Sequence, residues 1–172
     1  MYDSREVTIQ NNILDDTYFG IYLQYAKRCV IKNNHLKANN KEEQQSGNGI
    51  HCWKSDSLSI TGNTVDGHRD GIYFEFVTNS FIKSNTTSNN IRYGLHFMFS
   101  NDDHYVKNTF ERNGVGVAVM FSRRILMENN MFLFNWGTSA YGLLLKEIYD
   151  ADIVNNTFEQ NTIGIFIEGS NR

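Results

Sequence analysis

Apolar and polar positions along this chain repeat at intervals of roughly 22 residues, a period typical of stacked structural repeats. A glycine followed by an apolar residue recurs seven times, alternating with a recurrent asparagine. The spacing from each glycine to the next asparagine is identical in all six cases, whereas the return spacing varies. A rigid segment alternating with a variable one is typical of a solenoid with a loop-bearing corner. The two columns are Gly20, Gly49, Gly71, Gly94, Gly116, Gly142 and Gly164, and Asn12, Asn34, Asn63, Asn85, Asn108, Asn130 and Asn156.

Alternation of apolar and polar residues within each repeat predicts short strands and no helices. Such strands cannot bury a face alone, but as parallel strands stacked about 4.8 Å apart they enclose a continuous core. We therefore expect an all-β fold, a right-handed single-stranded parallel β-helix of about seven turns, forming one segment over residues 1–172. Two of the inward columns are Ile31, Ile60, Ile82, Tyr105, Met127 and Ile153, and Leu36, Val65, Thr87, Phe110, Phe132 and Phe158.

The repeated asparagines and glycines have a structural interpretation. Asparagine tolerates the left-handed conformation of a corner, and stacked amides can form a hydrogen-bonded ladder. The glycines are expected where a corner needs a positive φ or close packing. Cys29 and Cys52 fall in different columns, which predicts two buried, reduced thiols rather than a disulfide.

Composition narrows the classes of partner. The net charge of −3 and the pI near 5.9 argue against nucleic-acid binding. No apolar run approaches the roughly 18 residues of a membrane-spanning helix, and the first residues carry no apolar signal-peptide core. Because the repeats begin and end part-way through a turn without polar caps, we expect an excerpt of a longer β-helix.

The outward positions of the strand after each glycine are unusual for a solvated face. They concentrate aromatic, histidine and methionine side chains in the middle turns, and such a patch usually marks an interaction site. The first outward column is Tyr22, His51, Tyr73, His96, Ala118, Leu144 and Phe166. The second is Gln24, Trp53, Glu75, Met98, Met120, Lys146 and Glu168.

Thioether and imidazole groups on this face are the soft ligands that select Cu(I). We therefore name His51, His96, Met98 and Met120 as candidate metal ligands. Two strand spacings place His51 about 10 Å from His96, too far to share its ion without movement. The alternative is a protein-docking surface, where methionine and aromatic residues are also enriched. Docking is the preferred interpretation, and the two can coexist; the docking residues are Tyr22, Trp53, Tyr73 and Glu75.

Two polar clusters stand apart from this face, and neither contains a nucleophile–base pair. Arg69 and Arg92 share a column, which predicts either an anionic-ligand site or, preferably, a salt bridge at the corner with Asp70. Hydrolase or lyase chemistry would need paired carboxylates, or a base beside a carboxylate, on one exposed face, and Glu75 stands alone there. No catalytic residue is therefore assigned. The clusters are His68, Arg69 and Arg92, and Asp102, Asp103 and His104.

Six segments resemble the NosD family of periplasmic nitrous oxide reductase maturation proteins. They are "GNGIHCW" (47–53), "HRDGIYFEFVTNS" (68–80), "RYGLHFMFSNDDHY" (92–105), "NTFERNGVGVAVM" (108–120), "AYGLLLKEI" (140–148) and "GIFIEGSNR" (164–172). The resemblance implies a β-helix of the carbohydrate-binding and sugar-hydrolase type, exported to the periplasm. It implies transient copper binding, and as partners an ABC transporter made of an ATPase and a permease, nitrous oxide reductase and a copper-chaperone lipoprotein.

Three functions follow as hypotheses. The first is a non-enzymatic accessory protein that helps to assemble the copper–sulfur site of nitrous oxide reductase. The second is a polysaccharide lyase or epimerase, with Arg69, Arg92, Asp102, Asp103 and His104 as its candidates; fold analogy alone is a weak basis for it. The third is a structural spacer, whose exposed columns would tolerate any substitution.

Overall fold

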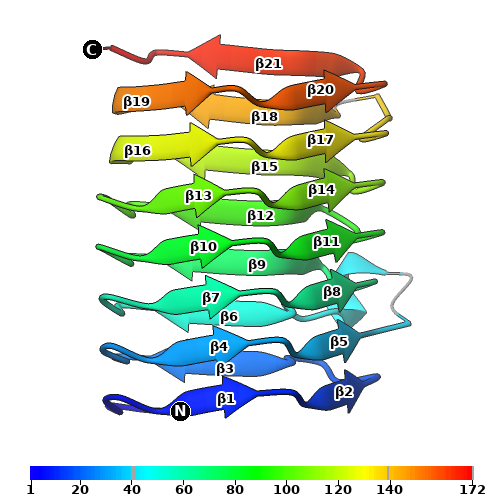
Figure 1. Ribbon diagram of the computed structural model, residues 1–172. Coiled ribbons are helices and arrows are strands. Elements are labelled where there is room, and N and C mark those ends of the chain that lie inside the picture. Colours follow the sequence, from blue (N-terminus) through cyan, green and yellow to red (C-terminus); the bar gives the residue numbers. More distant parts are fainter. Residues whose placement is uncertain (40–41, 139, 172) are drawn as a thin grey trace.

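Every turn of the chain contributes one short strand to each of three parallel sheets. The computed structural model describes residues 1–39, 42–138 and 140–171. The single β-helix segment expected over residues 1–172 therefore includes one residue, 172, beyond the last described one. Successive turns stack with the same strand always beside its counterpart in the next turn (Figure 1). The fold is a right-handed parallel β-helix of about seven turns, as predicted.

The three sheets are each seven strands long. Sheet I contains β1 (Thr8–Gln10), β4 (Val30–Lys32), β7 (Ser59–Thr61), β10 (Phe81–Lys83), β13 (His104–Val106), β16 (Arg123–Glu128) and β19 (Tyr149–Val154). Sheet II contains β2 (Ile13–Asp15), β5 (His35–Lys37), β8 (Thr64–Asp66), β11 (Thr86–Ser88), β14 (Thr109–Glu111), β17 (Met131–Leu133) and β20 (Thr157–Glu159). Sheet III contains β3 (Ile21–Gln24), β6 (Ile50–Trp53), β9 (Asp70–Glu75), β12 (Tyr93–Met98), β15 (Val115–Met120), β18 (Tyr141–Lys146) and β21 (Ile163–Glu168).

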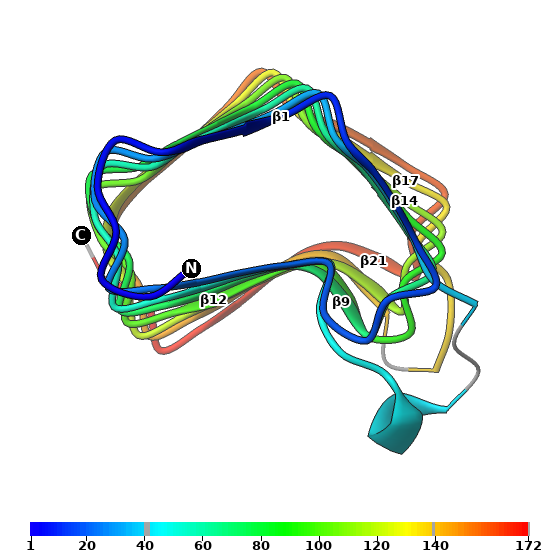
Figure 2. The same ribbon diagram turned by 90° about the horizontal axis from the view of Figure 1, so that it is seen from below.

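Viewed along its axis, the coil encloses one elongated core bounded by the three sheets (Figure 2). The predicted inward columns are buried through the middle turns, and Phe97 stacks on Tyr105 across the core with ring centroids 4.6 Å apart. Both cysteines are buried and free, as predicted. A 3₁₀ turn, η1 (Glu43–Gln45), lies outside the coil at the corner between sheets II and III (Figure 2).

The asparagine column forms the expected ladder. Asn108, for example, accepts hydrogen bonds from the backbone N–H and the side chain of Asn85 and donates to the carbonyl of Ile82. The conformational part of the expectation is wrong, because the ladder asparagines do not have positive φ. The residue before each one does, as at Asn33 and Lys107. The chain bends at that preceding residue, from a strand of sheet I into a strand of sheet II, and the asparagine amide then bonds to the next turn along the axis.

The glycine column is explained by close packing and not by positive φ. A Cβ added to Gly94 would lie 2.7 Å from the carbonyl oxygen of Gly116 in the next turn, and Gly71 would meet Gly94 at 2.5 Å. None of the seven glycines in this column has a positive φ. At every glycine of the column except Gly164, in the last turn, the backbone of the next turn lies too close for any side chain.

Candidate functional site

The outward columns of sheet III are aligned as predicted. Met98 of β12 pairs with Met120 of β15 and, on its other side, with Glu75 of β9. Both methionines are partly exposed. Two residues from adjacent turns of the coil therefore place their thioethers side by side on the outer surface.

Histidine and tyrosine rings form a continuous row of contacts in the neighbouring column. The ring centroids of His51 and Tyr73 are 4.8 Å apart, and those of Tyr73 and His96 are 5.2 Å apart. Tyr73 thus lies between the two imidazoles and keeps them from sharing a ligand. Burial, reinforced by Arg69, lowers the pKa of His51 to about 4, so this imidazole is neutral at neutral pH.

The expectation that His96 faces solvent is wrong. Only 5% of its surface is exposed, because the Tyr73 and Tyr93 rings cover it; the Tyr93 centroid is 4.5 Å away. Its Nδ1 lies 3.8 Å from Oδ2 of Asp70, and neither ring nitrogen has a hydrogen-bond partner. His96 is therefore held inside the face as an unpaired imidazole beside a carboxylate.

Asp70, the first residue of β9, is the functional candidate that the sequence did not assign to the site. The alternation of inward and outward side chains fails at this corner, because Gly71 and Ile72 both face the core. Asp70 therefore lies on the outward side of the strand, like Tyr73. The carboxylate is fully buried and neither oxygen has a hydrogen-bond partner. Its nearest cation is Arg92, whose Nε lies 3.7 Å from Oδ1.

Arg92 links this carboxylate to the excursion outside the coil. Its guanidinium also pairs with Glu43 of η1 at 2.9 Å, so the expected corner salt bridge is present with a second acid. Arg69, which was predicted to share a column with Arg92, lies in the adjacent turn. The backbone N–H of Arg92 donates a hydrogen bond to the carbonyl of Arg69 at 2.8 Å.

Unsatisfied buried polar atoms gather at this corner. Among the described residues, ten buried side-chain nitrogen and oxygen atoms lack a hydrogen-bond partner, and eight of them belong to five residues near the start of sheet III. Native proteins contain few such atoms, so their concentration makes this corner a candidate site. The five residues, here called the polar corner, are Asn48, His68, Arg69, Asp70 and His96.

His68 belongs to the polar corner but points into the core. It is fully buried, and its ring lies beneath Gly49, whose added Cβ would meet His68 Cδ2 at 3.2 Å. Burial lowers the pKa of His68 to about 4. This imidazole is therefore neutral, and it cannot be part of a surface site for anions.

The cluster predicted at Asp102, Asp103 and His104 lies at a different corner, between sheets III and I. Asp102 forms an exposed ion pair with Arg124, while His104 is exposed on sheet I. Asp103 is buried, and its Oδ1 accepts the N–H of Ser80 at 2.8 Å. These residues therefore make no common site with Arg69 and Arg92, because the length of sheet III separates the two corners.

The predicted docking residues share one surface. Tyr22 is exposed, while Trp53, Tyr73 and Glu75 are half-buried around it, and Tyr73 donates a hydrogen bond to Glu75 at 3.4 Å. The ammonium of Lys54 lies 4.5 Å from the Trp53 ring centroid. The surface is an aromatic face with polar groups at its margin, an arrangement typical of protein interfaces.

The chemistry of this face divides into two parts. The Met98–Met120 pair offers two soft sulfur donors, while Asp70 and His96 offer a carboxylate beside an imidazole. In the described part of the chain, no three His, Cys, Asp or Glu side chains come together to hold a metal ion. No helix in the same residues has the length and apolarity that a membrane crossing requires.

These features define a parallel β-helix with a candidate functional face on the outer side of one sheet. Residues 1–64 match the right-handed β-helix region, and residues 40–172 match the family of the periplasmic copper-binding protein NosD. The chain belongs to the NosD family. No curated protein matches it in sequence.

Solved structures share the fold at low sequence identity. The A-module of mannuronan C-5 epimerase AlgE4 from Azotobacter vinelandii is 16% identical with a TM-score of 0.75, over 97% of this chain and 57% of that one. A mutant of the periplasmic alginate epimerase AlgG is 22% identical with a TM-score of 0.75, over 87% and 34%. The Streptococcus pneumoniae surface adhesin PfbA is 13% identical with a TM-score of 0.56, over 99% and 61%. This chain thus spans only part of each of these proteins.

Proposed function

We propose that this chain is the β-helical part of a non-enzymatic periplasmic accessory protein that helps to assemble the copper–sulfur site of nitrous oxide reductase. Copper is its cargo, held transiently, and its partners are an ABC transporter, the apo-reductase and a copper-chaperone lipoprotein. The family match over residues 40–172 supports the copper role. The Met98–Met120 pair is the observation that carries it, since two thioethers lie in register on the outer face.

The residues fit a soft, weakly held ion. Met98 and Met120 supply two sulfur donors that are partly exposed on the outer face. His96 is left out of this set, because its imidazole is buried beneath Tyr73 and Tyr93 beside Asp70. A site with few ligands on an open face suits transfer, because a closed site of four ligands would retain the metal. His51 is also outside this set, because the turn of Tyr73 and Glu75 lies between its turn and that of Met98.

Cu(I) affinity, measured by competition with a chromophoric chelator, tests the assignment. Replacing both residues, Met98→Leu with Met120→Leu, conserves volume and removes the sulfur donors, and the affinity is expected to fall at least tenfold. The matched control is Met131→Leu, at an exposed methionine of sheet II. Equal affinity of the double variant and the control would refute the thioether site.

The partners are tested separately from the metal. Trp53→Ala is expected to weaken binding of the apo-reductase or of the transporter while Cu(I) affinity stays unchanged, because Trp53 lies in the docking face and outside the thioether pair. Binding unaffected by this substitution would exclude the aromatic face as the docking surface.

A second function is favoured by one specific observation. The carboxylate of Asp70 lies beside the imidazole of His96, and the Nε of Arg92 lies 3.7 Å from that carboxylate. This is a base beside a carboxylate that the sequence had not placed on sheet III, but both groups are buried, so a sugar reaches the imidazole only if the Tyr73 and Tyr93 rings move. A lyase or epimerase of acidic polysaccharide would use an imidazole to remove the proton next to the sugar carboxylate and a guanidinium to neutralise that carboxylate. Asp70 and His96 replace Asp102, Asp103 and His104 as its candidates.

This alternative is tested by incubating the protein with alginate or pectin in deuterated water. Unsaturated uronate products indicate a lyase, and deuterium uptake into the sugar indicates an epimerase. Turnover that His96→Asn abolishes, and that the Met98→Leu, Met120→Leu variant retains, would establish the enzyme. Absence of product and of deuterium uptake would leave the accessory function as the conclusion.

A further inference from the structure

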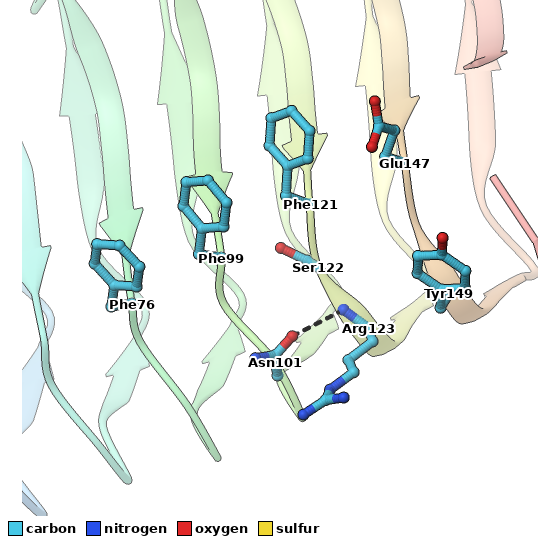
Figure 3. Close-up of a pocket in the computed structure, with 8 residues that line it drawn as sticks. All are labelled: Phe76, Phe99, Asn101, Phe121, Ser122, Arg123, Glu147 and Tyr149. Carbon is cyan, nitrogen blue, oxygen red and sulfur yellow. Dashed lines mark hydrogen bonds between the residues drawn. The ribbon is translucent and has the colours of Figure 1, made fainter. Parts of the chain in front are cut away.

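Three phenylalanine rings form an exposed ladder at the corner where sheet III leads into sheet I. Phe76, Phe99 and Phe121 occupy the same position in successive turns, each directly after the last residue of its sheet III strand. Adjacent rings are nearly parallel, with an interplanar angle of 12° and centroids 5.2 Å apart. Their exposed fractions are 43%, 41% and 39%. Figure 3 shows the three rings side by side on successive turns.

The fold does not require aromatic residues at this position. The same corner is occupied by Lys54 in the turn below and by Glu147 in the turn above, each with φ close to that of the phenylalanines. The left-handed backbone is therefore imposed by the turn, whereas the side chain is free to be charged. Three consecutive exposed rings in such a place call for an explanation outside folding.

The ladder forms one wall of a groove that runs along the axis of the coil. The opposite wall consists of Asn101, Arg123 and Tyr149 in successive turns, with a hydrogen bond from the Arg123 N–H to Asn101 Oδ1 at 3.0 Å (Figure 3). The cavity between the walls has a volume of about 390 Å³. Within the described residues the Arg123 guanidinium makes no ion pair.

We propose that this groove binds an amphipathic α-helix of a partner protein, lying parallel to the axis of the coil. An α-helix advances about 5.4 Å per turn, so apolar side chains at i, i+4 and i+7 recur at nearly the 5.2 Å spacing of the rings. Side chains on one face of an extended strand recur at about 6.7 Å. A bound strand would therefore fall out of step with the phenylalanine rings along the ladder. The unpaired Arg123 favours an acidic residue on the helix at its level.

The size of the surface also favours a single helix over a second copy of this chain. Three rings that are about two-fifths exposed offer roughly 250 Å² of apolar surface, taking about 200 Å² for each full side chain. A stable interface between globular proteins buries about 800 Å² on each partner. The exposed area of the three rings is thus well below what a stable dimer buries, and it suits a small partner segment such as a short helix.

This inference does not rest on copper, and it is tested in its absence. Two displayed peptide libraries serve as probes, and both are selected on the wild-type chain. One contains single helices of about 15 residues, the length at which an isolated helix becomes stable in water, with varied residues at i, i+4 and i+7. The other contains β-hairpins of equal size. The affinity of each selected peptide is then measured on variants, and we expect helices to be enriched and to lose at least tenfold in affinity on Phe99→Lys.

Phe99→Lys introduces the residue that Lys54 already places at this corner, so the turn accommodates it. The matched control is Phe81→Ser, which removes a phenylalanine that is 39% exposed on sheet I and introduces the residue of its register partner Ser59. Helices that bind wild type and Phe81→Ser but not Phe99→Lys support the proposal. Binders drawn only from the hairpin library, binders indifferent to Phe99→Lys, or a wild-type dimer that Phe99→Lys dissociates in sedimentation would each overturn it.

Discussion

The buried carboxyl of Asp103 should give this protein an unusual dependence of stability on pH. The side chain stands in the core in a column where the neighbouring turn has Ser80, whose N–H it accepts at 2.8 Å. Burial raises the pKa of Asp103 to about 8, although the hydrogen bonds from Ser80 and Tyr105 oppose this rise. The folded protein therefore holds this carboxyl protonated at neutral pH, whereas the unfolded chain ionises it at its ordinary value of 3.8.

The sign and size follow from proton linkage. Because the folded-state pKa is raised, the contribution of Asp103 is fully present below about pH 4 and is lost as pH rises through about 8. A difference of about four pKa units, at about 1.4 kcal/mol each, sets an upper bound of about 6 kcal/mol. Asp103→Asn keeps an acceptor for the Ser80 N–H and cannot ionise, so it should match wild type near pH 4 and exceed it in stability by several kcal/mol above pH 8.

Urea denaturation followed by circular dichroism between pH 4 and 9 measures the difference between the two proteins at each pH. The adjacent Asp102→Asn is the matched control. It removes an exposed carboxylate paired with Arg124, which is worth at most about 1 kcal/mol, and its effect should be small throughout. A difference between Asp103→Asn and wild type that does not grow from pH 5 to pH 8 would refute the reasoning.

Three further predictions concern the core, and each is checked by the free energy of unfolding. Asn108→Ala should cost on the order of 3 kcal/mol, because it leaves the buried backbone N–H of Asn85 without a partner and removes one of the two hydrogen bonds that the Asn85 side-chain nitrogen donates. Asn12→Ala at the exposed first turn should cost less than about 1 kcal/mol, and equal losses would contradict the ladder. Thr87→Val should stabilise the protein by about 1 kcal/mol, since it replaces a buried hydroxyl that has no hydrogen-bond partner, and a loss would show that the hydroxyl is satisfied. Gly94→Ala should cost several kcal/mol because its Cβ meets a backbone carbonyl at 2.7 Å, so an unchanged stability would mean that adjacent turns can separate there.

The repeat could be predicted from sequence because each side chain in a solenoid has its environment set by its place in the turn. The one constant spacing, from glycine to asparagine, was enough to place Met98 beside Met120, and the strand register confirms it. The same logic gave the core columns and the free cysteines. Residues far apart in the sequence meet in this fold because each turn contacts only the turns next to it, in the same arrangement all along the axis.

The corners were not predictable in the same way. Alternation assigns a face only while the strand stays extended, and at Gly71 two successive residues face the core, so Asp70 could not be placed. The covering of His96 depends on the Tyr93 ring, which belongs to a position where other turns have Val115 or Ile163. Burial at a corner is thus set by individual neighbours and not by the repeat.

The variable segment of each turn always precedes the glycine of sheet III. An insertion there lengthens an external loop and leaves the stacked coil in register, and the entropic penalty of a longer loop grows only slowly. In this protein, one such insertion brings Glu43 onto Arg92, which belongs to a later turn. The edge of sheet III is therefore a place where evolution can reshape a binding surface by loop length alone, while the scaffold that displays it stays constant.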